Sequence, residues 1–228
     1  MTISILAFDE GTGTYGGAAT TGSLCVGGWV LRGDPESGMS ASQGSLPSTM
    51  WGGDVLGLMR GGLPAADAVR RVVGADAGRD ERQLSALDPA GGTGAFTGGN
   101  SIATAGSRAA RHVVVAGNLL VSGRVLDACL AGFAGAEGPL DRRLLQALDA
   151  AAGVGGDARG LLSAALLVVG RDRAPLNLRI DHSEAPLAAL AALHRRATSG
   201  DYARWAAEVP TLQEPERATP CAVDPIPR

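Results

Sequence analysis

The chain of 228 residues contains no lysine, so all 20 of its basic residues are arginine. This absence excludes Schiff-base catalysis, a phosphate-loop lysine and a side-chain lysine acting as general base. Aromatic residues are scarce, with 3 Phe, 2 Tyr and 3 Trp. The formal net charge of −3 lacks the basic excess of a nucleic-acid-binding protein. We therefore expect no nucleic-acid partner.

Cysteines and long apolar runs are also few. Cys25, Cys129 and Cys221 lie too far apart in sequence for a zinc site or a redox dithiol, so we expect no metal and no cofactor. They are interpreted as small buried residues or, for Cys221, a tail thiol. No apolar stretch approaches the ~18 residues of a membrane span, and the first residues lack signal-peptide character. These features predict a cytoplasmic protein without a membrane partner.

The chain is rich in alternating strand and helix patterns. Several strands are predicted as members of hairpins, and pairs of helices separate them, which favours two antiparallel sheets with helices outside them. Residues 1–209 are expected to form one domain, and the Pro-rich residues 210–228 a tail. The predicted strands cover 2–7, 15–25, 38–43, 82–87, 93–97, 112–116, 163–169 and 176–180. The predicted helices cover 51–60, stretches beginning near Pro64, at Ser122 (as cap) and at Pro139, and then 185–197 and 201–208.

Two patterns resemble functional motifs but receive structural interpretations. The glycines of 11–16 match the spacing of a dinucleotide-binding loop, yet the residues after them carry no helical pattern, so a hairpin turn is predicted. The histidines, His112, His182 and His194, stand apart in sequence. His194 is expected on an exposed helix face beside two arginines.

The second residue offers a chemical hypothesis. Initiator methionine is normally removed before a residue as small as Thr2, which would leave a hydroxyl nucleophile and a free α-amine on one residue. An α-amine with a pKa near 8 is partly neutral at pH 7 and is able to take the hydroxyl proton. The mature chain would then carry an activated nucleophile without needing histidine or lysine.

The sequence as a whole resembles the DUF1028 family, assigned to the N-terminal-nucleophile hydrolase superfamily. The resemblance rests on the order and spacing of several segments taken together, and it implies a four-layer αββα sandwich. The matching segments are 2–7, Ser42-Gln43-Gly44, Arg82-Gln83-Leu84, 117–120, 155–160, 163–169 and 178–182.

The resemblance also implies roles for individual residues. Thr2 would be the nucleophile of an amidohydrolase that cleaves a C–N bond in a small-molecule substrate, and Gly44 would supply an oxyanion N–H. Asn118 would orient the α-amine or donate to the oxyanion, and Asp157 would stabilise the protonated amine. A homodimer is expected for this architecture. Expected substrate contacts come from Ser4, also the reserve nucleophile, and from Ser23, Gln43, Ser45 and Arg159.

Two alternatives to hydrolysis stay open. Proteasome-like members of the superfamily use a lysine to tune the nucleophile, and Arg32 cannot accept a proton in its place. A non-catalytic binding or scaffold protein on the same fold is therefore one alternative. The other is an acyltransferase or cyclase in a specialised pathway, with an amine instead of water as the acyl acceptor.

Overall fold

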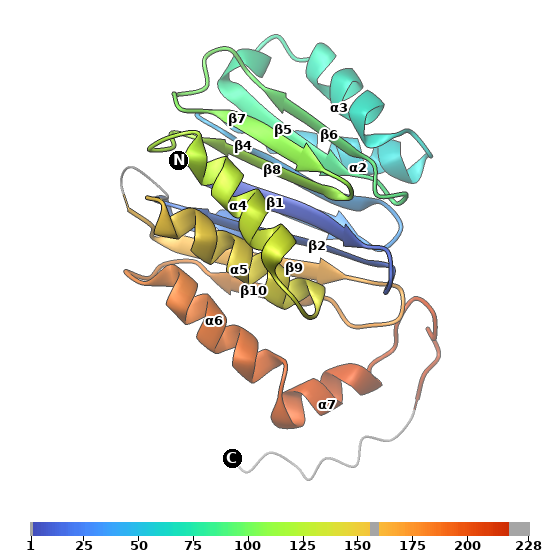
Figure 1. Ribbon diagram of the computed structural model, residues 1–228. Helices are drawn as coiled ribbons and strands as arrows, with labels where there is room; N and C mark the ends of the chain where they lie inside the picture. The colour runs from blue at the N-terminus through green and yellow to red at the C-terminus, as the bar shows by residue number, and fades with distance from the viewer. Residues whose placement is uncertain (1, 156–159, 219–228) are drawn as a thin grey trace.

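The computed structural model of the chain describes residues 2–155 and 160–218. Within these residues the protein is an α+β structure of two antiparallel sheets and seven α-helices (Figure 1). The strands are β1 Thr2–Asp9, β2 Thr14–Thr21, β3 Leu31–Asp34, β4 Gly38–Gly44, β5 Arg82–Leu87, β6 Thr93–Thr97, β7 Gly106–Ala110, β8 Val113–Asn118, β9 Ser163–Val169 and β10 Leu176–Ile180. The helices are α1 Val26–Trp29, α2 Trp51–Arg60, α3 Ala65–Gly74, α4 Arg124–Gly135, α5 Leu140–Gly153, α6 Pro186–Ala197 and α7 Gly200–Glu208, with a 3-10 turn at Arg79–Glu81.

The larger sheet has six strands in the order β10-β9-β2-β1-β8-β7. Strand β1 lies inside this sheet, and its first residue, Thr2, pairs with Thr21 of β2 and Asn118 of β8. Successive residues of a strand face opposite sides of the sheet. Ile3 accordingly joins the apolar core formed with α4 and α5, whereas Leu6 joins the core formed with the smaller sheet. Thr2 therefore faces the layer between the two sheets.

The smaller sheet has the strand order β3-β4-β5-β6. Its outer face packs against α2 and α3, where Trp51 and Val55 meet Leu84 in a third apolar core. On the outer face of the larger sheet, α4 and α5 cross the strands, and α6 covers β9 and β10 (Figure 1). Three cores thus lie between helices and the larger sheet, between the two sheets, and between the smaller sheet and helices.

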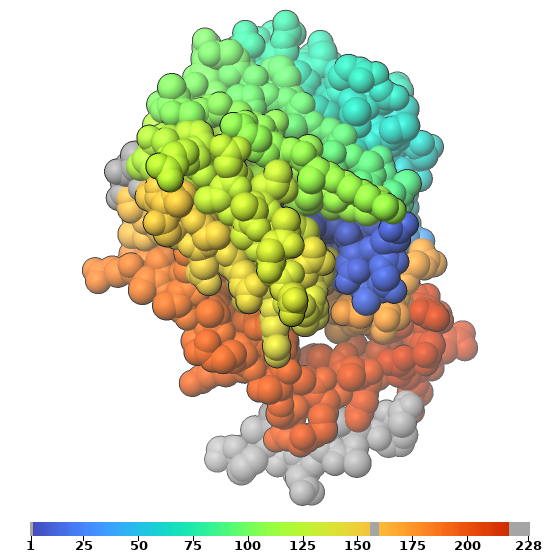
Figure 2. Space-filling model, in the orientation of Figure 1, coloured from blue at the N-terminus to red at the C-terminus, as the bar shows by residue number. Residues whose placement is uncertain are grey.

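The C-terminal helices form one end of the molecule, coloured orange to red in Figure 2. Residues 210–218 turn back after α7, and the backbone N–H of Gln213 donates to the carbonyl of Arg171 at 2.8 Å. The Arg217 guanidinium donates to the carbonyl of Ala207 at 2.8 Å. This segment is therefore held against the body of the protein by main-chain acceptors.

The predicted pair of antiparallel sheets is confirmed, and α2, β5, β6, β9 and β10 have the predicted bounds. Three short elements were not predicted: strands β3 and β7 and helix α1. Strands β3 and β7 lie at the edges of their sheets, where one neighbour strand is missing and alternation is weak. The strand predicted over 15–25 ends at Thr21, because the chain then turns and Cys25, with φ of 61°, precedes the four-residue helix α1.

Two local predictions were wrong. His194 is buried rather than exposed, and its Nε2 lies 2.6 Å from Asp141 Oδ2, which joins α6 to α5. A hydrogen-bonded contact inside the helix layer had no sequence signal, since the partners are 53 residues apart. Helix α4 begins at Arg124 after Gly123, so Ser122 does not cap it with its side chain.

The interpretations of the glycine-rich segment and of Cys129 agree with the structure, whereas Cys25 is only partly buried and Cys221 lies outside the described residues. Residues 10–13 form the exposed turn between β1 and β2, so the glycine-rich segment is a hairpin turn and no helix follows it. Cys129 is buried without a disulfide, and burial raises the pKa of its thiol to about 12. No helix in the described ranges is long and apolar enough to span a membrane.

Candidate functional site

A cavity of about 700 Å³ opens at the edge of the layer between the two sheets. Thr2 lies on its wall at the start of β1, and the wall continues through the segment after β2 and the loop after β4. A cavity of this size suits a small organic molecule. Its lining residues are Thr2, Thr21, Ser23, Leu24, Val26, Trp29, Val30, Gln43, Gly44, Ser45, Leu46, Pro47, Thr49 and Arg82.

Thr2 is half-buried, and its hydroxyl has a close polar neighbour. Its Oγ1 lies 3.2 Å from Oγ1 of Thr21, the residue paired with it on β2. On the other side, Asn118 is its partner at the end of β8. The sheet register therefore fixes a hydroxyl and an amide on either side of Thr2, independently of any loop.

Behind Thr2, a network of buried amides connects the two sheets. The Gln43 Nε2 atom donates to Gln83 Oε1 at 2.6 Å and reaches the Thr2 carbonyl oxygen at 3.4 Å. Asn118 Nδ2 donates to the same Gln83 oxygen at 3.2 Å. Gln83 Nε2 has three acceptors within 3.0 Å, from Thr97 and the Gly106 and Gly117 carbonyls, although an amide nitrogen has only two hydrogens. These bonds hold Gln43 and Asn118 in fixed positions beside Thr2.

One atom of this network lacks a partner. The Gln43 Oε1 atom is buried and accepts no hydrogen bond from any group that the structure describes. A buried amide oxygen without a partner costs about 1–3 kcal/mol relative to a bonded one. Gln43 also lines the cavity. Its oxygen is therefore an acceptor that a donor in the site would satisfy.

Gly44 ends β4 in a conformation that requires glycine. Its φ is 132°, and a Cβ at this position would lie 2.6 Å from the Glu81 carbonyl oxygen. The backbone N–H of Ser42 donates to Val30, away from β5. Because alternate residues of a strand direct their N–H groups to the same edge, the Gly44 N–H also points away from β5, on the cavity side. The next two N–H groups, those of Ser45 and Leu46, are already bonded to Glu81.

The opposite wall is held by a serine of β9. Ser163 Oγ donates to the Ser23 carbonyl at 2.8 Å and accepts from the Val26 N–H at 3.1 Å. The Cys25 N–H donates to the Asp181 carbonyl at 3.0 Å. The segment that carries Leu24 and the short helix α1 is thereby tied to the larger sheet, and the cavity has a fixed wall on this side.

The structure brings most of the residues predicted for the site together. Thr2, Ser23, Gln43, Gly44 and Ser45 all line the same cavity. Asn118 adjoins Thr2 through the register and the amide network. Ser4 faces the same layer but is fully buried and does not line the cavity. Asp157 and Arg159 lie outside the described residues.

Three residues of the site were not predicted as functional. Thr21 is the cross-strand partner of Thr2, Gln83 is the centre of the amide network, and Arg82 lines the cavity. The tripeptide Arg82-Gln83-Leu84 carried part of the family resemblance, so the sequence did single out Arg82 and Gln83, but no functional role was predicted for them. The pairing of Thr2 with Thr21 depends on hairpin register, which the sequence alone does not specify.

A second cavity, of about 630 Å³, lies at the far end of the molecule beside Asp88, Pro89 and His112. Its buried carboxylate is already used, because Asp88 accepts the backbone N–H groups of Ala65, Ala90 and Gly92. Within the described residues, no three His, Cys, Asp or Glu side chains gather as a metal site would require. The cavity at Thr2 is therefore the stronger candidate.

Comparison with known proteins gives the family of the chain. A crystal structure of protein SPO2555 from Silicibacter pomeroyi, described as DUF1028, is similar to it with a TM-score of 0.91 and 50% identity. The similarity covers 95% of this chain and 98% of that one. No curated protein matches. The family model described as "Family of unknown function (DUF1028)" matches residues 2–190, and the chain therefore belongs to the DUF1028 family.

Proposed function

We propose that this protein is an N-terminal-nucleophile amidohydrolase with a four-layer αββα fold, and that it cleaves a C–N amide bond in a small molecule. The observation that carries the proposal is the position of Thr2. Thr2 begins a strand inside the larger sheet and lines a cavity of about 700 Å³. The order of helices, two facing sheets and helices supports the fold assignment.

The proposed reaction requires removal of Met1, which frees the Thr2 α-amine. The neutral amine takes the hydroxyl proton, directly or through water, and Oγ1 attacks the substrate carbonyl carbon. The C–N bond breaks, and the proton passes to the leaving nitrogen. Water then cleaves the acyl ester, releases the acid and restores Thr2. No step needs a metal or a lysine.

Two neighbouring groups support this chemistry. The Gly44 N–H is directed to the cavity side and is held by a backbone that tolerates only glycine, so it is preorganised to donate to an oxyanion. The side-chain oxygen Oε1 of Gln43 is buried close to Thr2 and has no partner among the described residues, so it is suited to accept from the α-amine. Asn118 would orient the amine from the other side of Thr2.

The first test uses Thr2→Ala and Thr2→Ser in a screen of small amide substrates, with release of amine and acid as the readout. We expect Thr2→Ala to keep its fold, as judged by circular dichroism and melting temperature, and to lose turnover below the detection limit. Thr2→Ser keeps a hydroxyl and should retain measurable turnover. Full activity of Thr2→Ala would refute the proposal, and product analysis separates hydrolysis from transfer to an amine.

The absence of lysine sharpens the same test. The N-terminal amine is the single primary amine of the chain, so an amine-selective acylating reagent modifies that position specifically. Intact-mass measurement reports both the loss of Met1 and the extent of modification. Inactivation in proportion to modification is expected. A fully modified or Met1-retaining protein with full activity would show that the α-amine is not the base.

A further inference from the structure

The cavity at Thr2 has one charged side chain among its described lining residues, the guanidinium of Arg82. The remaining described lining residues are apolar or neutral polar, and none is acidic. Arg82 begins β5 and is the register partner of Gly44, the proposed oxyanion donor. Arg82 has the same strand parity as Leu84, so its side chain leaves the sheet on the side of α2, and the residue borders the cavity at the strand end that carries Gly44.

Three contacts fix the position of this guanidinium. Its Cζ lies 5.8 Å from the centre of the Trp51 ring, and Nη1 donates to Asp76 Oδ1 at 3.2 Å. A Cβ on Gly78 would lie 2.2 Å from Nη1, so the glycine leaves the space that the guanidinium occupies. The side chain is consequently held in a slot formed by Trp51, Asp76 and Gly78.

Most of the hydrogen-bonding capacity of Arg82 is unused. A guanidinium has five N–H donors, and Asp76 is its one side-chain partner among the described residues. The Arg82 Nε atom is buried and has no hydrogen-bond partner among the residues that the structure describes. Arginine binds a carboxylate with two parallel hydrogen bonds where the geometry allows. Asp76 already balances the charge of the guanidinium, but the donors left over would favour a carboxylate on a bound molecule that accepts two hydrogen bonds.

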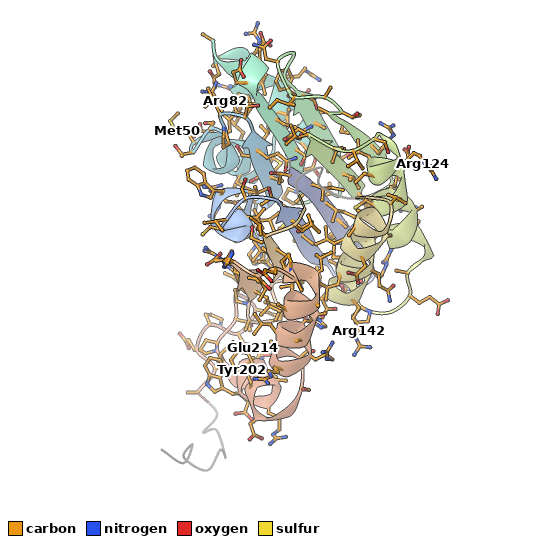
Figure 3. The ribbon with its side chains drawn as sticks, turned by 90° about the vertical axis from the view of Figure 1, so that its left-hand side faces the viewer. Met50, Arg82, Arg124, Arg142, Tyr202 and Glu214 are labelled. Atoms are coloured by element: carbon orange, nitrogen blue, oxygen red, sulfur yellow. The ribbon has the colours of Figure 1, made fainter. Side chains whose placement is uncertain are left out.

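The mouth of the cavity is apolar. Leu24, Trp29 and Leu46 line it and have 54%, 53% and 63% of their surface exposed. Met50 follows one residue after the lining residue Thr49 and is 65% exposed. Figure 3 shows Met50 and Arg82 on the same side of the molecule. Large exposed apolar side chains gathered at a cavity are typical of a site that binds an apolar group.

We propose that the substrate is an N-acyl amino acid, a conclusion that rests on the proposed function. Its carboxylate binds Arg82, its apolar acyl chain lies on Leu24, Trp29 and Leu46, and its amide carbonyl lies between Thr2 and Gly44. Thr2 Oγ1 forms an ester with the acyl carbon as the C–N bond breaks. The leaving nitrogen takes the hydroxyl proton, so the free amino acid departs, and water then releases the carboxylic acid.

Binding tests this proposal without turnover. N-Hexanoyl-leucine and its uncharged carboxamide, N-hexanoyl-leucinamide, are titrated by calorimetry into full-length Thr2→Ala. We expect the acid to bind about 10- to 100-fold more tightly, the range for charge-assisted hydrogen bonds. Equal affinity for the two compounds, or no binding of either, would overturn the proposal.

Further variants in the Thr2→Ala background assign the preference to Arg82. Arg82→Gln should abolish it, and Gly78→Ala, which displaces the guanidinium without removing it, should reduce it. Arg124→Gln is the matched control, since Arg124 is exposed and lies on the opposite side of the molecule (Figure 3). Should Arg82→Gln fail to fold, Gly78→Ala decides the question. A preference unchanged in a folded Arg82→Gln or Gly78→Ala protein would refute the role of Arg82.

The outcomes separate the two proposals. If the protein binds the acid through Arg82 but cleaves no amide, the carboxylate subsite is supported and the hydrolase assignment is refuted. If the protein cleaves the neutral carboxamide as fast as the acid, with Thr2 as nucleophile, the hydrolase assignment is supported. The proposal that the substrate is an N-acyl amino acid is then refuted.

Discussion

The two ends of the layer between the sheets have the same backbone architecture and opposite chemistry. At one end the strands contribute apolar residues to a closed core, Leu6 from β1, Met39 from β4, Leu87 from β5 and Val114 from β8. Four residues along each of the same strands, the inward positions are polar: Thr2, Gln43, Gln83 and Asn118. Each of the four strands therefore changes character along its length, from core to candidate site.

The polar end is built with unsatisfied groups. Ser4 Oγ, Ser85 Oγ and Gln43 Oε1 are buried there and have no hydrogen-bond partner among the described residues. An apolar core of the same shape would avoid this cost, which is about 1–3 kcal/mol for each unbonded group. Functional sites commonly break the rules that favour stability elsewhere in a fold. The contrast assigns stability to the apolar end and agrees with the proposal that the polar end, where Gln43 lines the cavity, binds a ligand.

The largest expected effect on stability lies at the apolar end. Leu6 is fully buried, and its methyl groups pack close to Gly17, against which Met39 and Leu31 also pack. Leu6→Ala should lower the free energy of unfolding by about 2–5 kcal/mol, from lost apolar contact and the cavity left behind. Denaturant unfolding measures the change. A loss below 1 kcal/mol, as a rough bound, would show that this end of the layer is not a tightly packed core.

A smaller loss is expected from the centre of the amide network. Gln83→Met keeps a similar side-chain length but removes the bonds to Gln43, Asn118 and Thr97. We expect a loss of about 1–3 kcal/mol, because partner amides are left unbonded. Leu84→Met, on the outer face of the same strand, is the control and should lose less than about 1.5 kcal/mol. Equal losses in the two variants would mean that the network adds nothing beyond packing.

The sequence was sufficient for most of the fold because periodicity is a local property. The valines of β8 and the apolar run of β9 are strands by pattern alone, and Pro64 and Pro139 precede helices as proline preferences predict. The edge strands β3 and β7 carry no such pattern. Burial of His194 depends on Asp141, a contact between distant segments that local periodicity does not encode.

The candidate site was only partly predictable for the same reason. Thr2 and Gly44 had a chemical or positional signal, the first from its place behind Met1 and the second from its place between strand and helix. The importance of Thr21 and Gln83 depends on register, since Thr2 pairs with Thr21 and Gln43 pairs with Gln83. The role proposed for Arg82 depends on its slot between Trp51 and Gly78, which exists only in the folded chain. The cytoplasmic location, the homodimer and the boundary at residue 209 stay predictions.

The smallest expected change in stability is that of Ser4→Ala, and it tests directly whether the polar end of the layer differs from the apolar end. Ser4 lies on β1 two residues from Leu6, faces the same layer and is equally buried, but its hydroxyl has no partner in the described structure. Ser4→Ala removes a group that burial already penalises, so stability should range from unchanged to a gain of about 1 kcal/mol. Ser42→Ala is the matched control: Ser42 is also fully buried, but its Oγ donates to the Ser48 carbonyl at 3.0 Å. Its removal should cost about 1 kcal/mol. If Ser4→Ala lost as much as Ser42→Ala, the Ser4 hydroxyl would have to be bonded in solution, and the polar end would be a satisfied network rather than a reserved site.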